Sequence, residues 1–346
     1  MTRYEMAQIV AKAMAKGANV DKLAAEFADE LDNLGVRVAK LEKKADNVKV
    51  AGEVRYHYMS TDSEFEHQLR SRIFINGQIN EDWSYTGMLQ NIQDFKNNTG
   101  DEGTSFKRAF VEGKLGGVAV KAGRYDAFFA DGNIYDAEAD GLELSYGDKV
   151  KLTGFVGKGT DAETELAGKT VDSTYGKYLG AEISAELKDV NAKIGYFKYK
   201  DMFENSAEGK GMDNKILYVG ADYTVGDVNV AAMYLKGDTN SKYEQKFGKA
   251  DDDGLVVTLS YKGAEADEVG SWGLFATYYN QGGQTYVAHT TDANTFDNNG
   301  FKGYGIGANY TFAKNMVGTV VYYDTENKLD SKEDDQRLWA DLTFTF

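Results

Sequence analysis

Arginine is concentrated in one part of the chain. Five of the eight arginines lie between positions 55 and 124, namely Arg55, Arg70, Arg72, Arg108 and Arg124. Guanidinium groups stay charged at any physiological pH and repel one another, so a group of them creates a strong local positive field. The chemistry available to such a set is the attraction and steering of small charged solutes, and Lys121 is a further candidate member.

An acidic stretch follows these arginines directly. Residues 127–140 carry Asp131, Asp136, Glu138 and Asp140. Carboxylates held opposite a row of guanidinium groups produce a transverse field, which favours small, hydrated, polar solutes over apolar ones. The alternative interpretation is an ordinary acidic loop in water, with the arginines in solvated or ion-paired positions.

Enzymatic and metal chemistry find little support in the sequence. The chain has no cysteine and only three histidines, His57, His67 and His289. It contains no motif of a serine hydrolase, a phosphate-binding loop or a zinc protease. Asp251–Asp253 could attract calcium, although a solvated loop is the favoured interpretation. We therefore predict a protein that is not an enzyme and that binds no metal and no cofactor.

The charge balance also excludes a class of partner. The chain has a formal net charge of −16 and a sequence pI of about 4.7. Nucleic-acid binding requires concentrated basic residues that neutralise phosphates. We therefore predict no nucleic-acid partner.

The elements that position these charges are short alternating segments, about sixteen of them between residues 49 and 346. In one of them Leu69 and Ile73 share a face, whereas Arg70 and Arg72 share the other. This period of two residues is typical of β-strands with one apolar and one polar face. The connections alternate in length: short ones lie near Asn80, Gly116, Asp148, Lys188, Gly226 and Ala313, and long polar ones cover 96–104, 127–140, 158–175, 201–213, 238–253, 282–299 and 326–333.

This pattern predicts an all-β fold, a transmembrane antiparallel barrel of about sixteen strands. Barrels of the outer membrane have short turns at one end and long loops at the other. Sixteen strands enclose an aqueous lumen, so the polar faces point inward and the apolar faces point to lipid. The absence of proline agrees with a closed sheet in which backbone N–H groups must donate. Strict alternation places Lys121 inside but sends Arg124 outward. Either a bulge reverses the phase there or Arg124 contacts a neighbouring protomer.

The first 48 residues have helical composition. Residues Thr2–Ala15 form an amphipathic pattern with capping-box spacing between Thr2 and Glu5. Apolar residues then recur at alternating intervals of four and three, which predicts a coiled coil. Its alternative is a single amphipathic helix lying on its own domain. The seam consists of Val20, Ala24, Phe27, Leu31, Leu34, Val38, Leu41, Ala45 and Val48.

Three stretches resemble a known family. The alternating last strand, which ends at Phe346, resembles the terminal strand of Gram-negative outer-membrane barrels. Gly123-Arg124-Tyr125-Asp126, followed by 127–140, is similar to the region of general porins where the third loop folds into the lumen. Thr2-Arg3-Tyr4-Glu5-Met6-Ala7 resembles the closing helix of an S-layer-homology (SLH) module. Together they resemble the OmpM-type outer-membrane porins.

The resemblance implies three parts: residues 1–17 as the last helix of a truncated SLH module, 18–48 as a coiled-coil stalk and 49–346 as the porin barrel. It implies a homotrimer in the outer membrane, with the stalk in the periplasm and Thr2, Arg3 and Glu5 in the wall-binding module. The expected function is passive diffusion of small hydrophilic solutes and ions, together with attachment to peptidoglycan. The alternative is a structural tether whose barrel is only an anchor.

Overall fold

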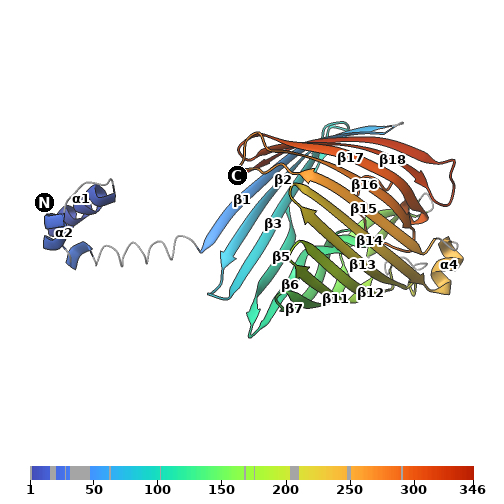
Figure 1. Ribbon diagram of the computed structural model, residues 1–346, viewed down its shortest axis with the longest axis horizontal. Coiled ribbons are helices and arrows are strands. Elements are labelled where there is room, and N and C mark those ends of the chain that lie inside the picture. Colours follow the sequence, from blue (N-terminus) through green and yellow to red (C-terminus); the bar gives the residue numbers. More distant parts are fainter. Residues whose placement is uncertain are drawn as a thin grey trace.

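A closed β-sheet makes up most of the protein. The structure is a computed structural model that describes residues 2–15, 21–27, 29–31, 47–61, 64–101, 103–166, 169–174, 176–202, 210–247, 251–289 and 291–346. Every strand of the main sheet is antiparallel to its neighbours. The strands run obliquely around the barrel in Figure 1.

The sheet has seventeen strands, of which β4 (Thr99–Gly100) is a two-residue addition and sixteen are long. The long strands are β1 (Val48–Ser60), β2 (Phe65–Gln78), β3 (Trp83–Asp94), β5 (Ser105–Leu115), β6 (Val118–Phe129), β7 (Tyr135–Gly147), β8 (Val150–Gly159), β11 (Lys177–Leu187), β12 (Val190–Lys200), β13 (Asn214–Val225), β14 (Val228–Thr239), β15 (Asp253–Lys262), β16 (Trp272–Gly282), β17 (Gly300–Ala313), β18 (Met316–Asn327) and β19 (Asp334–Thr345). The sequence prediction of an all-β barrel of about sixteen strands is confirmed.

The first and last strands close the barrel. β1 pairs with β2 on one side and with β19 on the other, from Glu53 opposite Thr345 to Ser60 opposite Leu338. Beyond the ladder, the Gly52 N–H donates to the Phe346 carbonyl (2.7 Å) and the Phe346 N–H donates to the Gly52 carbonyl (3.0 Å). The ring of Phe346 occupies the place where a Gly52 side chain would lie. Closure leaves neither of these two strands with an open edge.

The outer face of the barrel is apolar. Alternate residues of the long strands expose large aliphatic side chains, for example Leu152 (54%), Val219 (50%) and Val320 (50%). Their neighbours in the sequence point inward, and several of them are polar or aromatic and buried, such as Thr153 and Tyr218. An apolar exterior around a polar interior is the reverse of a soluble barrel, and it suits a lipid environment.

Long and short connections lie at opposite ends of the barrel, as alternation along the chain requires. The end with the long connections carries a two-stranded sheet, β9 (Asp161–Leu166) with β10 (Lys169–Thr174), the helix α4 (Ser241–Phe247) and the turn η1 (Asp297–Asn299). One predicted loop is wrong: residues 127–140 belong mostly to β6 and β7, and only residues 130–134 connect them. The apolar alternation of Tyr125, Ala127 and Phe129 continues the strand through the acidic stretch.

The N-terminal residues contain α1 (Arg3–Ala15) and α2 (Asp21–Glu26). The capping box is confirmed: the Glu5 N–H donates to Thr2 Oγ1 (3.2 Å) and the Thr2 N–H donates to Glu5 Oε2 (2.7 Å). Arg3 binds Glu30 (Nε to Oε1, 2.6 Å) and lies over the Phe27 ring (5.1 Å). None of the helices among the described residues has the length and apolar character needed to cross a membrane.

The coiled-coil stalk is not supported by the described residues. Phe27 is 7% exposed and packs with Ala7 and Val10 of α1, and Leu31 lies against the same group. The first described residues of the apolar seam therefore pack against α1 of the same chain. A row of apolar side chains at this spacing can pack against any apolar helix face, so the spacing alone does not identify the partner. Val48 is not in a helix but begins β1. Seam positions 20, 34, 38, 41 and 45 lie outside the described residues.

Candidate functional site

The strands β6 and β7 leave the barrel wall before they end. β5 pairs with β6 from Leu115 opposite Val118 only as far as Ala109 opposite Arg124. β7 pairs with β8 no further than Ala139 opposite Gly159. Residues 125–129 and 135–138 therefore form a ladder with each other and no longer with β5 or β8. We call residues 125–139 the inner hairpin.

Two glycines permit this departure. Gly123 has a φ of +128°, and a Cβ built there would lie 2.5 Å from the Ala109 carbonyl oxygen. Its cross-strand partner Gly141 is crowded in the same way, since a Cβ would lie 2.5 Å from the Tyr178 hydroxyl. Side chains at both positions would collide with the neighbouring strands. The pair marks the bend where the hairpin separates from the wall.

One face of the inner hairpin packs against the inside of the barrel. Tyr125 (1% exposed) and Phe129 (4%) are buried there. The Phe129 ring lies 5.0 Å from Phe155, 5.1 Å from Tyr178 and 4.4 Å from Phe197, measured between ring centroids. These rings come from β8, β11 and β12. The contact fills that part of the lumen with aromatic side chains and fixes the hairpin in it.

The opposite face of the hairpin carries carboxylates toward β5. Arg108 binds Asp126 (Nη2 to Oδ1, 2.9 Å) and Glu138 (Nε to Oε1, 3.4 Å). Asp126 and Glu138 are cross-strand partners, and the next pair on the same face is Phe128 opposite Asp136. The arrangement brings acidic side chains of the hairpin together with a basic side chain of the wall.

The other arginines of the wall are held in place by neighbouring inner side chains. Arg70 binds Glu53 (Nη2 to Oε1, 2.8 Å), and Arg72 Nη1 lies 3.9 Å from the same oxygen. Arg72 also donates from Nε to Gln90 Oε1 (2.8 Å). Arg55 lies over the Trp339 ring, with Cζ 5.2 Å from its centroid. These partners fix guanidinium groups that repel one another.

The remaining predicted site residues have other partners. At the hairpin tip, Asp131 binds Lys193 of β12 (2.5 Å). Asp140 binds Arg124 through both carboxylate oxygens (2.7 and 2.8 Å), at the base of the hairpin. Lys121 lies over the Tyr125 ring (5.5 Å). Strict alternation predicted that Arg124 points outward. Strand β6 separates from the barrel wall at Arg124. The side chains that follow on the same face of β6 therefore point into the lumen.

Sequence reasoning missed Asp126, Glu53 and Gln90. Asp126 has the parity of the lipid face, and only the bend at Gly123 turns it toward Arg108. Glu53 precedes Arg55 by two residues and shares its face, so alternation alone could have identified it. Gln90 carries no charge, and nothing in the sequence distinguishes it.

The hairpin tip is also joined to residues 283–299, the connection between β16 and β17. The N–H groups of Val287 and Ala288 donate to the Ile134 carbonyl (2.9 and 3.2 Å), and the Asp136 N–H donates to the Ala288 carbonyl (3.0 Å). Tyr135 and Ala288 form an isolated parallel bridge. This connection therefore folds inward rather than away from the barrel.

A polar chain through His289 strengthens the junction. The Thr291 N–H donates to His289 Nδ1 (3.1 Å), so Nε2 carries the proton and donates to Gln281 Oε1 (3.0 Å). Gln281 Nε2 then donates to the Asn133 carbonyl (3.1 Å) of the hairpin. The chain requires a neutral imidazole, because a protonated Nδ1 could not accept from Thr291.

Acidification is expected to loosen this junction. Burial lowers the pKa of His289 to about 3, from an ordinary value of about 6.5. The undocked state then binds more protons, so docking is fully stable above about pH 7 and weakens as the pH falls, by at most about 2 kcal/mol at pH 5. Amide exchange at Val287 and Ala288 should accelerate at pH 5 beyond the intrinsic effect of pH. A His289→Gln variant, which cannot titrate, should lack the difference; equal pH dependence in both proteins would contradict the expectation.

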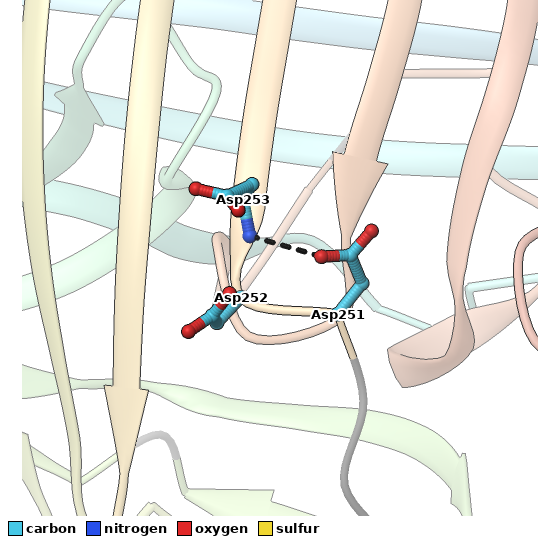
Figure 2. A group of neighbouring side chains, drawn as sticks. All are labelled: Asp251, Asp252 and Asp253. Atoms are coloured by element: carbon cyan, nitrogen blue, oxygen red, sulfur yellow. Dashed lines mark hydrogen bonds between the residues drawn. The ribbon is translucent and has the colours of Figure 1, made fainter.

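The acidic cluster Asp251–Asp253 is shown in Figure 2, where Asp251 accepts from the Asp253 N–H (3.3 Å). Its carboxylates already have basic partners. Lys236 binds Asp252 (2.8 Å) and Asp253 (3.1 Å), and Lys328 binds Asp251 (2.5 Å). These ion pairs join the cluster to β14 and to the connection after β18, and the three side chains are still 41–52% exposed, which is compatible with the interpretation as a solvated loop.

Comparison with known proteins identifies the fold. No family model and no curated protein sequence matches the chain. Among solved structures, it is similar to OmpF of Salmonella typhi in complex with daunomycin (17% identity, TM-score 0.58, covering 86% of this chain and 97% of that one). It is similar to an anion-selective porin from Comamonas acidovorans (14%, 0.55, 86% and 99%) and to the trimer form of OmpT, an outer membrane protein of Vibrio cholerae (14%, 0.54, 86% and 99%). At these identities the similarity establishes the porin-like barrel fold.

Proposed function

We propose that this protein is an outer-membrane porin, a water-filled channel for the passive diffusion of small hydrophilic solutes and ions. The observation that carries the proposal is the inner hairpin, whose Asp126 and Glu138 face Arg108 inside a sixteen-stranded barrel. Opposed fixed charges on a low-dielectric wall select among hydrated solutes. We propose no catalytic activity, since diffusion needs only the shape and charge of the passage.

The fold and its neighbours support this function over that of a simple anchor. Sixteen strands enclose far more space than side chains alone can fill, and a membrane anchor needs neither that width nor a hairpin inside it. One of the similar structures, the protein of Comamonas acidovorans, is an anion-selective porin by its own description. Planar-bilayer recording of the purified protein tests the proposal. Stepwise channel openings are expected, and their absence would favour the tether alone.

Charge reversal tests whether Arg70 and Arg72 line the conducting path. The double variant Arg70→Glu/Arg72→Glu is expected to shift the selectivity toward cations, because four units of charge change beside the hairpin carboxylates. The measurement is the zero-current potential across a membrane in a salt gradient. The matched control is Lys188→Glu/Lys314→Glu, which makes the same charge change in exposed turns. If the two double variants have the same selectivity, the arginines do not line the conducting path.

We further propose a homotrimer tethered to the cell wall. The trimer form of the similar Vibrio cholerae protein supports the first part, and the SLH-like helix α1 supports the second. The coiled-coil stalk of residues 18–48 stays a prediction for its seam positions 34, 38, 41 and 45, where it would join three chains. Cosedimentation of the protein with purified peptidoglycan tests the tether: loss of binding is expected in an Arg3→Ala variant, which breaks the contact with Glu30.

A further inference from the structure

Residues 283–299 are packed into the barrel along much of their length. Gln284, Thr285 and Tyr286 are at most 3% exposed, and Ala293 is fully buried. Tyr286 and His289 pack their rings against Phe301 of β17 (6.1 and 5.5 Å). A connection with these contacts has a defined position, held by the inner hairpin at one point and by β17 at another. We call residues 283–299 the second inner segment.

The second inner segment also reaches β19, the strand that closes the barrel with β1. Asp292 binds Arg337 of β19 (Oδ1 to Nη1, 3.5 Å). Arg337 is held in turn by Asp335 (3.6 Å). The positive charge of Arg55 of β1 also acts on Asp292. The side chains of Asp292 and Arg337 are 29% and 15% exposed, so both are largely withdrawn from bulk water.

Burial raises the pKa of Asp292, whereas the positive charges of Arg337 and Arg55 lower it. A carboxylate in this position is poorly screened by salt compared with one on an open loop. Its charge therefore acts strongly on ions that pass nearby.

On the basis of the proposed channel function, we propose that the second inner segment is a second selectivity element of the pore, in which Asp292 binds Arg337 and lies in the field of Arg55. Ions then pass two charged sites in series, one at the inner hairpin and one at Asp292. The hairpin supports both sites, because its Ile134 carbonyl accepts from Val287 and Ala288 of the second inner segment and its Asp136 N–H donates to the Ala288 carbonyl. The carboxylate of Asp292 reduces the attraction of the two arginines for anions.

The test is the permeability ratio of anions to cations for Asp292→Asn, measured from zero-current potentials in a KCl gradient. Removing the carboxylate is expected to raise this ratio about twofold at 0.1 M salt and less at 1 M, where screening is stronger. Asp330→Asn is the matched control, since Asp330 is an exposed carboxylate in the neighbouring connection. Asp292→Glu keeps the charge and should restore the original ratio.

The outcomes are distinct. A ratio for Asp292→Asn equal to that of the unmodified protein or of Asp330→Asn would overturn the second site. A shift of the same size in Asp292→Glu would also overturn it, because displacement of the segment rather than lost charge would then be the cause. If the unmodified protein forms no channels, the proposed porin function is wrong, and the second selectivity element is wrong with it.

Discussion

Arginine in place of Val320 is expected to lower the free energy of unfolding of the barrel by about 2–4 kcal/mol, the cost of a cationic side chain facing the hydrocarbon layer. Val320 lies near the middle of β18, is 50% exposed and points away from the lumen. The measurement is reversible denaturant unfolding of the protein in phospholipid vesicles, followed by tryptophan fluorescence.

Thr319→Arg is the control for this substitution. Thr319 is the preceding residue of the same strand, faces inward and lies opposite Asp341 of β19. A guanidinium group there meets water and a carboxylate, so we expect a change of no more than about 1 kcal/mol. Equal losses from the two substitutions would contradict the assignment of the outer face to lipid.

Removal of most of the inner hairpin is expected to at least roughly double the single-channel conductance, because conductance rises with the open cross-section. Asp126 and Glu138 are directly opposed, so an Asn-Gly turn can join them in place of residues 127–137. The variant loses Phe129, which fills the aromatic side of the lumen, and Ile134, which holds the second inner segment. Discrimination between anions and cations should fall together with the rise in conductance.

A turn at the opposite end of the barrel provides the control. Lys188→Asn/Asp189→Gly places the same Asn-Gly sequence in an exposed connection, and Lys188 already has a positive φ of 55° that asparagine tolerates. Its conductance should match that of the unmodified protein. A folded hairpin variant with unchanged conductance would show that the hairpin does not restrict the passage.

The barrel could be predicted because its signals repeat. Each strand alternates with a period of two, and sixteen such segments with connections of alternating length leave few other folds. The faces of Arg70 and Arg72 followed from the same alternation, since a strand in a closed sheet keeps its phase. These properties depend on each residue and its neighbours along the chain.

The inner hairpin could not be predicted in the same way. Its position depends on Phe155 and Phe197, which come from strands later in the chain, and on the bend at Gly123. Beyond that bend the outer face of β6 turns inward, so a phase rule that worked for Arg70 fails for Asp126. A similar limit applies to the N-terminal seam, where periodicity detected the apolar stripe but not that Phe27 packs against α1.

The pairing of β1 with β19 has a consequence for the chain connectivity that the barrel tolerates. Residues 53 and 345 lie opposite each other on paired strands, so the strands form a cycle in which no strand is intrinsically the first. Moving the chain ends to an exposed turn such as Gly226, while linking Phe346 to Val48, would keep every ladder of the sheet. The order of strands along the gene is thus one of several that specify the same barrel, and circular permutants opened at the short turns are expected to fold.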